Sequence, residues 1–143
     1  MTSTSIIADS GFWIALFNRS DAFHAQSVTA LSGLEKRLIT TWPVMTETCH
    51  ILLRRGGQAA QQQFVSQWVQ GRFDIFEVTH AHATKIQALM HKYADLPMDF
   101  ADASLVLLAG ELGHGDILTT DQRDFGAYRW KSRRPFRNLL LTE

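Results

Sequence analysis

The sequence predicts an α/β fold in which a mostly parallel sheet of five short strands is layered with six or seven helices. Two observations indicate this class. The chain contains several short apolar runs, which are typical of buried strands. These runs alternate along the chain with longer segments whose apolar residues recur at helical spacing. The chain of 143 residues contains no internal repeat and no low-complexity segment, so we expect a single domain over residues 1–143.

The first half of the chain predicts two strands and four helices. The strands are the apolar runs SIIAD (5–9) and RLITT (37–41), and the helices are 11–18, 21–34, 44–55 and 59–70. Asp21 is the expected N-cap of the second helix, and Pro43 suits the first turn of the third. Gly56 and Gly57 are expected to end that helix, and Gly71 to stop the fourth.

The second half of the chain continues the alternation. FDIFEV (73–78) alternates and contains aromatic residues, DILTT (116–120) is a further strand, and FRNLLL (136–141) is the expected last strand. Helices are expected at 80–94 and 100–112, separated by the sequence LPMD and closed by Gly113. Residues 121–125 form a turn that leads into a short helical piece.

Four acidic residues fall where the predicted strands end. Asp9 ends the first strand, and Asp121 directly follows the fourth. Glu47 and Asp102 are placed in the first turns of the helices that follow the second strand and Pro97. Ligands of open α/β sheets bind beyond the carboxyl ends of the strands, so all four acids are expected at one edge. Each acid taken singly is more often a helix cap than a ligand.

Gathering these acids is electrostatically expensive. Two carboxylates 5 Å apart repel by about 3 kcal/mol at an effective dielectric near 20, and six pairs by about 15–20 kcal/mol before screening. A whole domain is stable by only about 5–15 kcal/mol. The cluster must therefore protonate, spread apart or hold a cation. Oxygen ligands suit Mg²⁺ or Mn²⁺, and such ions at a sheet edge indicate phosphodiester hydrolysis.

Two further acids stand three residues from members of this set. Asp99 shares a helix face with Asp102, and Asp124 stands in the same relation to Asp121. Each is either a ligand of a second metal ion or a helix cap, and the capping interpretation is favoured for both.

The segments IIADSGFWIALFN, TWPVMTETCHILL, MDFADASLVLLAGELG and ILTTDQRDF resemble, in order and spacing, the acidic motifs of the PIN-domain family, in particular the VapC-like toxins of bacterial toxin–antitoxin pairs. The resemblance implies a three-layer α/β/α domain and a Mg²⁺- or Mn²⁺-dependent ribonuclease. It implies Asp9, Glu47, Asp102 and Asp121 as ligands, with Ser10 and Thr120 holding water or orienting a carboxylate. It further implies a homodimer and a small antitoxin across the cleft. PIN domains also occur in RNA processing, so a housekeeping nuclease stays open.

A basic segment near the C-terminus lies among no acids. It is either a solvated linker or a phosphate-contacting patch for RNA, and it contains Arg129, Lys131, Arg133, Arg134 and Arg137. Over the whole chain charge is balanced, with 14 basic and 14 acidic residues. The single cysteine, Cys49, fits a reducing compartment, and the N-terminal sequence has neither a basic leader nor a membrane span. We therefore expect a soluble, cytoplasmic protein without a membrane partner.

Two other functions compete with a nuclease. A binding module of the same fold would keep the acids as caps and bind RNA or protein without cleaving it. A phosphorylated receiver or aspartate phosphatase would also need an aspartate at a strand end. Both of these are disfavoured. The phosphatase would need D-x-D spacing, but position 11 is Gly, and the receiver would need an aspartate after the middle strand, but RLITT has no acid.

Overall fold

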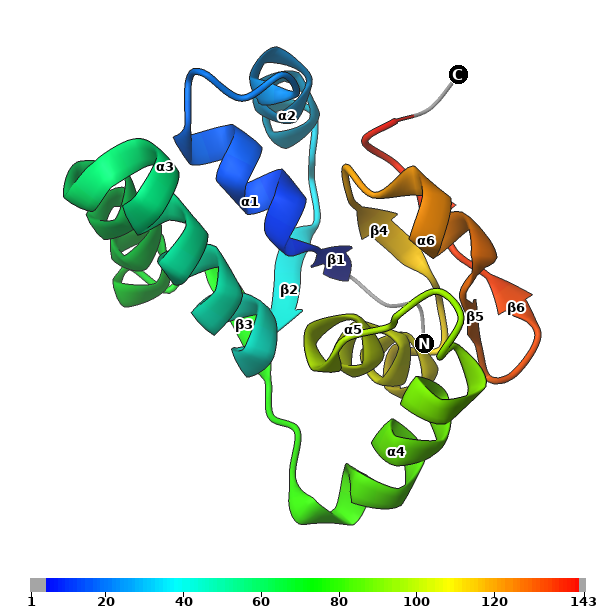
Figure 1. Ribbon diagram of the computed structural model, residues 1–143. Coiled ribbons are helices and arrows are strands. Elements are labelled where there is room, and N and C mark those ends of the chain that lie inside the picture. Colours follow the sequence, from blue (N-terminus) through cyan, green and yellow to red (C-terminus); the bar gives the residue numbers. More distant parts are fainter. Residues whose placement is uncertain (1–4, 142–143) are drawn as a thin grey trace.

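The computed structural model describes residues 5–141, and its centre is a five-stranded parallel sheet (Figure 1). The strands are β1 (Ser5–Ala8), β2 (Arg37–Thr41), β3 (Phe73–Phe76), β4 (Asp116–Leu118) and β7 (Arg137–Asn138). They lie in the order β3-β2-β1-β4-β7, and every neighbouring pair is parallel. The predicted number of strands and their direction are confirmed.

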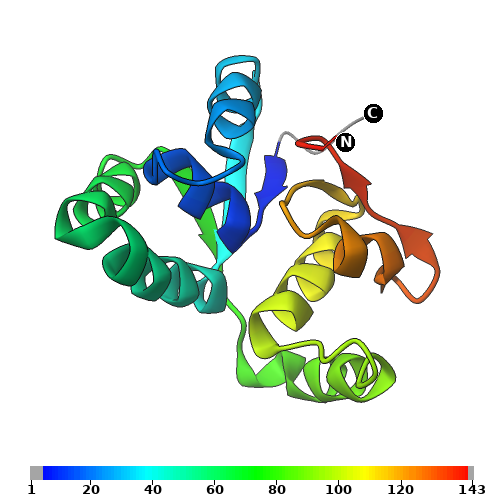
Figure 2. The ribbon, with the colours of Figure 1, turned by 45° about the horizontal axis from the view of Figure 1, so that its top comes forward.

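The helices connect these strands and flank the sheet. They are α1 (Ser10–Phe17), α2 (His24–Ser32), α3 (Trp42–Val69), α4 (Ala83–Lys92), α5 (Phe100–Leu112) and α6 (Gln122–Ala127), with a short 3₁₀ turn η1 (His80–His82) before α4. Helices α1 and α3 lie together on one side of the sheet, and α4 and α5 lie together on the other (Figure 2). The predicted α/β/α layering is therefore confirmed.

Helix α5 is buried along most of its length. All seven residues from Ala103 to Ala109 are buried, because the sheet covers one side of the helix while α4 and a C-terminal hairpin cover the other. This double cover explains why the sequence of α5 is an unbroken apolar run without a polar face. The helix is consequently a fixed support for the residues at its N-terminus.

Several boundaries differ from the sequence prediction. Asp21 does not cap α2, which begins three residues later at His24; its Oδ1 instead accepts a hydrogen bond of 2.9 Å from the Phe23 backbone N–H in the preceding turn. By contrast, the predicted break at Gly56 and Gly57 is confirmed: α3 consists of two helical stretches that meet at a kink at Gly57, whose backbone is not helical (φ 84°, ψ 177°).

The C-terminal segment contains a hairpin that the sequence did not predict. Strands β5 (Arg129–Trp130) and β6 (Arg134–Pro135) pair antiparallel, and the last sheet strand is only Arg137–Asn138 rather than residues 136–141. Two-residue strands are too short to leave an alternating pattern in the sequence. Among residues 5–141, no helix is both long and apolar enough to cross a membrane.

Candidate active site

The carboxyl-terminal edge of the sheet borders a pocket of about 290 Å³ that gathers six carboxylates. We call it the acidic pocket; its acids are Asp9, Glu47, Asp99, Asp102, Asp121 and Asp124. They come from positions more than a hundred residues apart in the chain. The structure therefore brings together all four predicted acids and the two that stand three residues from Asp102 and Asp121.

Asp9 is held at the middle of the sheet. Strand β1 pairs with β4 in the register Ala8↔Leu118, and the Asp9 backbone N–H extends this pairing by donating to the Leu118 carbonyl at 3.0 Å. The carboxylate is 5% exposed and caps α1 by accepting from the Ser10 N–H at 2.7 Å. Its other oxygen accepts from the Thr119 hydroxyl at 2.7 Å. Both oxygens of Asp9 are thus fixed in direction.

Gly11 allows the start of α1 to lie directly against the loop after β4. A Cβ atom at this position would overlap the Thr120 Oγ1 atom. Any larger residue would push Thr120 away from α1 and widen the pocket between Asp9 and Asp121. The glycine that breaks a D-x-D motif in the sequence therefore has a steric role in the structure.

Asp102 occupies the first turn of α5, as predicted. The Asp99 carboxylate caps this helix by accepting from the Asp102 backbone N–H at 2.8 Å, which agrees with the capping interpretation. The Asp102 side chain accepts a hydrogen bond of 2.9 Å from the hydroxyl of Tyr128, whose ring is fully buried. Tyr128 therefore fixes one Asp102 oxygen, and the other has no protein donor among the described residues.

At the fourth strand the capping role falls to Asp121 and not to Asp124. Asp121 caps α6 by accepting from the Asp124 N–H at 3.0 Å, while its own N–H donates to the Thr119 hydroxyl at 2.9 Å. Asp124 lies in the first turn of α6, 3.8 Å from the exposed guanidinium of Arg123. The expectation that Asp124 is a cap is wrong, because the helix begins directly after Asp121.

Glu47 reaches the pocket from the second turn of α3. The sequence placed it in the first turn, but α3 begins at Trp42, immediately after β2 ends at Thr41. No loop separates strand and helix, so α3 begins two residues earlier than the predicted helix, and Glu47 lies about half a turn farther along it than expected. Its longer side chain still lines the pocket.

Burial and mutual repulsion raise the pKa values of the acids. Burial, opposed by the hydrogen bonds from Thr119 and Ser10, raises the pKa of Asp9 to about 6. Burial and then the charge of Asp9 raise the pKa of Asp102 to about 8, against the hydrogen bond from Tyr128. The pKa of Asp124 is also raised, chiefly by burial. The pocket thus favours bound protons, or a bound cation in their place.

The donor atoms of the pocket fit a hard divalent cation. Among residues 5–141, no three His, Cys, Asp or Glu side chains are grouped closely enough to enclose a metal ion by themselves. Mg²⁺ needs only one or two carboxylates, with water and substrate oxygens completing its shell, whereas structural zinc needs four converging ligands. The all-oxygen donor set of the acidic pocket therefore fits Mg²⁺ or Mn²⁺ and not zinc.

Sequence reasoning missed two residues that hold the acids. Ser10 and Thr120 line the pocket, and the Ser10 hydroxyl makes a long hydrogen bond of 3.5 Å to Asp9. The shorter hydroxyl hydrogen bond to Asp9, of 2.7 Å, comes from Thr119, which the sequence did not single out. The TT pair in ILTTD could have suggested either threonine. Tyr128 follows Asp102 by 26 residues and has no sequence signal, because its contact depends on α6 folding back over α5.

The basic segment divides into two groups. Arg137 forms a two-pronged ion pair with Asp116, and Arg129 donates to the Gly126 and Tyr128 carbonyls. These two arginines therefore have partners within the protein, and whether the segment also contacts RNA phosphates stays a prediction. Lys131, Arg133 and Arg134 are exposed on the hairpin.

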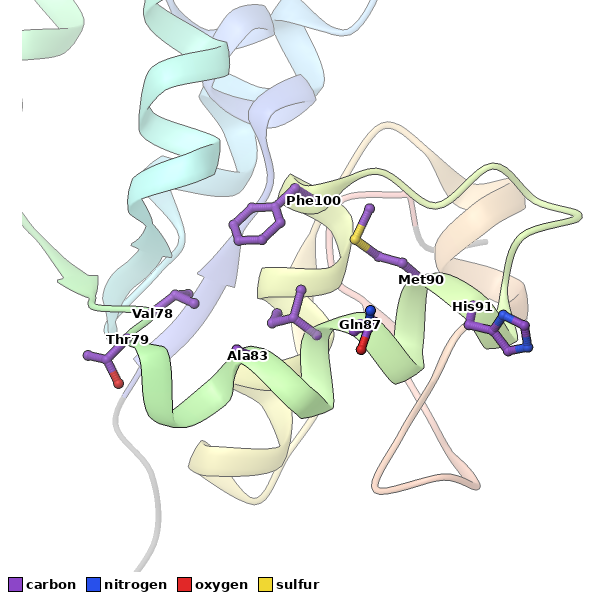
Figure 3. A pocket seen from close by; sticks show the side chains of 8 residues that line it. Val78, Thr79, Ala83, Gln87, Met90, His91 and Phe100 are labelled. Atoms are coloured by element: carbon purple, nitrogen blue, oxygen red, sulfur yellow. The ribbon is translucent and has the colours of Figure 1, made fainter.

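A larger hollow next to the acidic pocket is apolar. Figure 3 shows Phe100, from the start of α5, facing side chains of α4 such as Met90, with Val78 at the other end. This hollow has a volume of about 720 Å³, and its only titratable lining group is His91. It has the character of a contact surface, whereas the acidic pocket is lined by carboxylates.

Comparisons with known proteins agree with this geometry. A family model described as PIN domain matches residues 6–131. Over 124 residues the chain is 25% identical to Ribonuclease VapC26 of Mycobacterium tuberculosis, covering 87% of this chain and 92% of the relative. The fold matches the crystal structure of Mycobacterium tuberculosis VapC20, described as a Sarcin-Ricin loop cleaving toxin, with a TM-score of 0.77. That match has 21% identity and covers 82% of this chain and 91% of the other, and it shows the shared fold alone.

Proposed function

Because this chain belongs to the PIN-domain family, we propose that it is an endoribonuclease that hydrolyses RNA phosphodiester bonds with Mg²⁺ or Mn²⁺ in the acidic pocket. The observation that carries the proposal is the gathering of six carboxylates at one sheet edge. Among the described residues, neither Asp9 nor Asp102 has a basic ion-pair partner. A relative named as a ribonuclease aligns over most of the chain and supports the same reaction.

The residues have distinct tasks in this proposal. Asp9 and Asp102 would hold the cation, with Glu47 and Asp121 adding ligands or bridging water. When bound, the cation would activate a water molecule and offset the charge of the scissile phosphate. Thr119 and Tyr128 keep the Asp9 and Asp102 oxygens aimed at the pocket through the two hydrogen bonds described above. Both act as positioning residues, since they contact the acids rather than the substrate.

The test is cleavage of a labelled structured RNA by the purified protein. Cleavage is expected with Mg²⁺ or Mn²⁺, loss with EDTA, and recovery when the divalent ion is returned. If the protein binds this RNA equally well with and without divalent ions but never cleaves it, the protein is a binding module and the nuclease proposal is wrong.

We further propose that the protein is the toxin of a type II toxin–antitoxin pair and forms a homodimer. The support is the apolar hollow beside the acidic pocket, where the Phe100 ring is 46% exposed. A small partner protein that filled this hollow could extend across the pocket and exclude RNA. VapC20, whose fold this chain shares, is described as a toxin.

Co-expression with the product of the neighbouring gene tests the toxin proposal. A small protein should co-purify and inhibit RNA cleavage, and Phe100→Ser should weaken the complex without lowering cleavage by the free enzyme. Normal cell growth on expression of the active enzyme alone would favour the housekeeping role instead. Light scattering of the free protein tests the homodimer.

A further inference from the structure

A second groove lies farther along α5, and its character is opposite to that of the acidic pocket. It has a volume of about 590 Å³ and runs between α4, α5 and the β5–β6 hairpin. Its basic lining residues are Lys85, Lys92 and Lys131. The chain has only four lysines, the other being Lys36, so three of the four line one groove. We call it the lysine groove.

The lysine groove has one acidic lining residue, and that residue is engaged. Glu111 lies 3.4 Å from the His82 imidazole. None of the three lysines forms an ion pair with a described carboxylate. The hairpin adds Arg133 and Arg134, both exposed, and residues 125–141 contain no acid. Positive charge in the groove is therefore not neutralised within the described chain.

The hairpin presents Lys131 in a strained conformation. Lys131 and Ser132 have positive φ angles of 45° and 71°, which cost free energy for residues other than glycine. The turn is held to α4 by the Lys92 ammonium, which donates to the Ser132 carbonyl at 3.3 Å. Strain of this kind often accompanies functional sites. Here it turns the hairpin so that Lys131 closes the groove beside Gly110 of α5.

The groove is within reach of an RNA strand in the acidic pocket. Its α5 residues Val106 and Gly110 follow Asp102 by four and eight positions, or about 6–12 Å along the helix axis at a rise of 1.5 Å per residue. A helical nucleic-acid strand carries one phosphate per about 3.4 Å, so this distance corresponds to about two to four nucleotides. An RNA whose scissile bond lies in the acidic pocket would bring its neighbouring phosphates to the lysines.

We propose that Lys85, Lys92 and Lys131 form an anchoring site for the RNA phosphate backbone, adjacent to the acidic pocket. Ammonium groups on flexible stems suit backbone phosphates without reading base sequence. The site would offset the repulsion between substrate phosphates and the six carboxylates. This inference rests on the proposed nuclease function for its substrate, but its test does not depend on cleavage.

The test measures binding of a fluorescein-labelled ten-nucleotide oligo(U) RNA by anisotropy in EDTA, where no cleavage occurs. Lys85→Ala/Lys131→Ala should weaken binding by about 10-fold and lower the slope of log K against log salt by about 1.4, or 0.7 for each lost contact. Arg54→Ala/Arg55→Ala is the matched control: it removes two exposed charges from α3, on the other side of the sheet, and should change affinity by less than about 2-fold. Lys85→Arg/Lys131→Arg should retain binding, which separates loss of charge from loss of fold.

Equal binding by the Lys85→Ala/Lys131→Ala variant and the parent would overturn the proposal. So would stronger competition by polyglutamate than by unlabelled RNA of equal charge, since the groove would then suit an acidic protein. If this variant loses RNA affinity but the parent never cleaves RNA with Mg²⁺ or Mn²⁺, the groove stands and the nuclease function fails. If the parent cleaves RNA and the variant binds it normally, only the groove fails.

Discussion

At the amino-terminal edge of the sheet two strand aspartates have arginine partners, whereas Asp9 and Asp102 at the opposite edge have none among the described residues. Arg37 of β2 donates twice to Asp74 of β3, at 3.0 and 2.9 Å. Arg137 of β7 donates twice to Asp116 of β4, both at 3.0 Å. These arginine hydrogen bonds lower the pKa values of Asp74 and Asp116, while burial raises those of Asp9 and Asp102.

The difference separates acids that are paired within the protein from acids whose charge is left unpaired. A carboxylate on a strand can be neutralised by an arginine on the neighbouring strand, and this chain does so twice. The acidic pocket lacks that arrangement for Asp9 and Asp102, although it lies on the same sheet. Its acids are therefore a cost to the metal-free fold, and a divalent cation would relieve that cost.

Charge removal at the two edges should affect cleavage very differently. Asp9→Asn or Asp102→Asn is expected to lower the rate of RNA cleavage by at least about 10²–10³-fold, because the cation loses a principal ligand. The matched control is Asp116→Asn, which removes one carboxylate from the other edge and should leave the rate within about 2-fold. Circular dichroism checks that each variant is folded. Equal losses at both edges would remove the functional distinction between them.

The stability of the metal-free protein should fall as pH rises. The pKa values of Asp9 and Asp102 in the folded state, about 6 and about 8, exceed their ordinary value of 3.8. Between about pH 4 and pH 8 the folded state holds protons that the unfolded chain has released, so the free energy of unfolding decreases through this window. Solvent exposure of Asp102 reduces the effect, and we expect a loss of about 2–4 kcal/mol. Urea denaturation at pH 5 and pH 8.5 measures it.

Two additions sharpen the pH experiment. Asp102→Asn should flatten the pH dependence and stabilise the metal-free protein at pH 8, since it removes a repelling charge. Saturating Mg²⁺ should restore stability at high pH in the parent but much less in the variant. A metal-free protein that is most stable at pH 8 would contradict the raised pKa values.

Tyr128→Phe should have an intermediate effect on cleavage. It removes the hydrogen bond that fixes one Asp102 oxygen but keeps the buried ring. A hydrogen bond to a charged group contributes about 1.5–3 kcal/mol, so a decrease of roughly 10–100-fold in cleavage is expected, together with weaker Mn²⁺ binding. The pKa of Asp102 should rise further, because the tyrosine hydroxyl lowers it. Calorimetric Mn²⁺ titration separates this positioning role from a loss of core packing, which would leave affinity unchanged.

The smallest effect is expected at the arginine pairs. Arg37→Ala breaks an exposed ion pair, since both side chains are about half exposed. Exposed pairs contribute little to stability, so the melting temperature should fall by less than about 4 °C and cleavage should not change. A large loss of cleavage activity in this variant would show that the amino-terminal edge influences the acidic pocket.

The sequence allowed the fold and the acidic pocket to be predicted because both depend on local pattern. Two apolar strands are each followed by an aspartate: Ile6–Ile7 by Asp9, and Ile117–Leu118 by Asp121. The carboxyl ends of parallel strands lie at the same edge of a sheet, so these aspartates could be expected to meet. The contacts that orient the acids were beyond such reasoning. Tyr128 reaches Asp102 only through the fold of α6, and the hairpin is set by two positive φ angles rather than by an alternating pattern.

The first residue of a helix was the other feature that the sequence predicted incorrectly. Trp42 begins α3 directly after Thr41, which moves Glu47 into the second turn, and α6 begins so early that Asp121 rather than Asp124 is its cap. A single residue of displacement at a strand–helix junction changes which side chain caps the helix and which faces the pocket. Periodicity locates the helix but does not fix its first residue.

The central position of β1 sets the order in which the enzyme is completed. β1 lies between β2 and β4, so the first strand of the chain finds its second partner only after about a hundred more residues have been synthesised. A growing chain that has passed Asp102 but has not reached Asp116 already contains Asp9, Glu47 and Asp102, but it lacks both the strand beside Asp9 and the threonine that orients its carboxylate. If the protein is the ribonuclease proposed above, a nascent polypeptide would be inert until β4 has been made, and this would delay harm to the RNA of the cell that makes it.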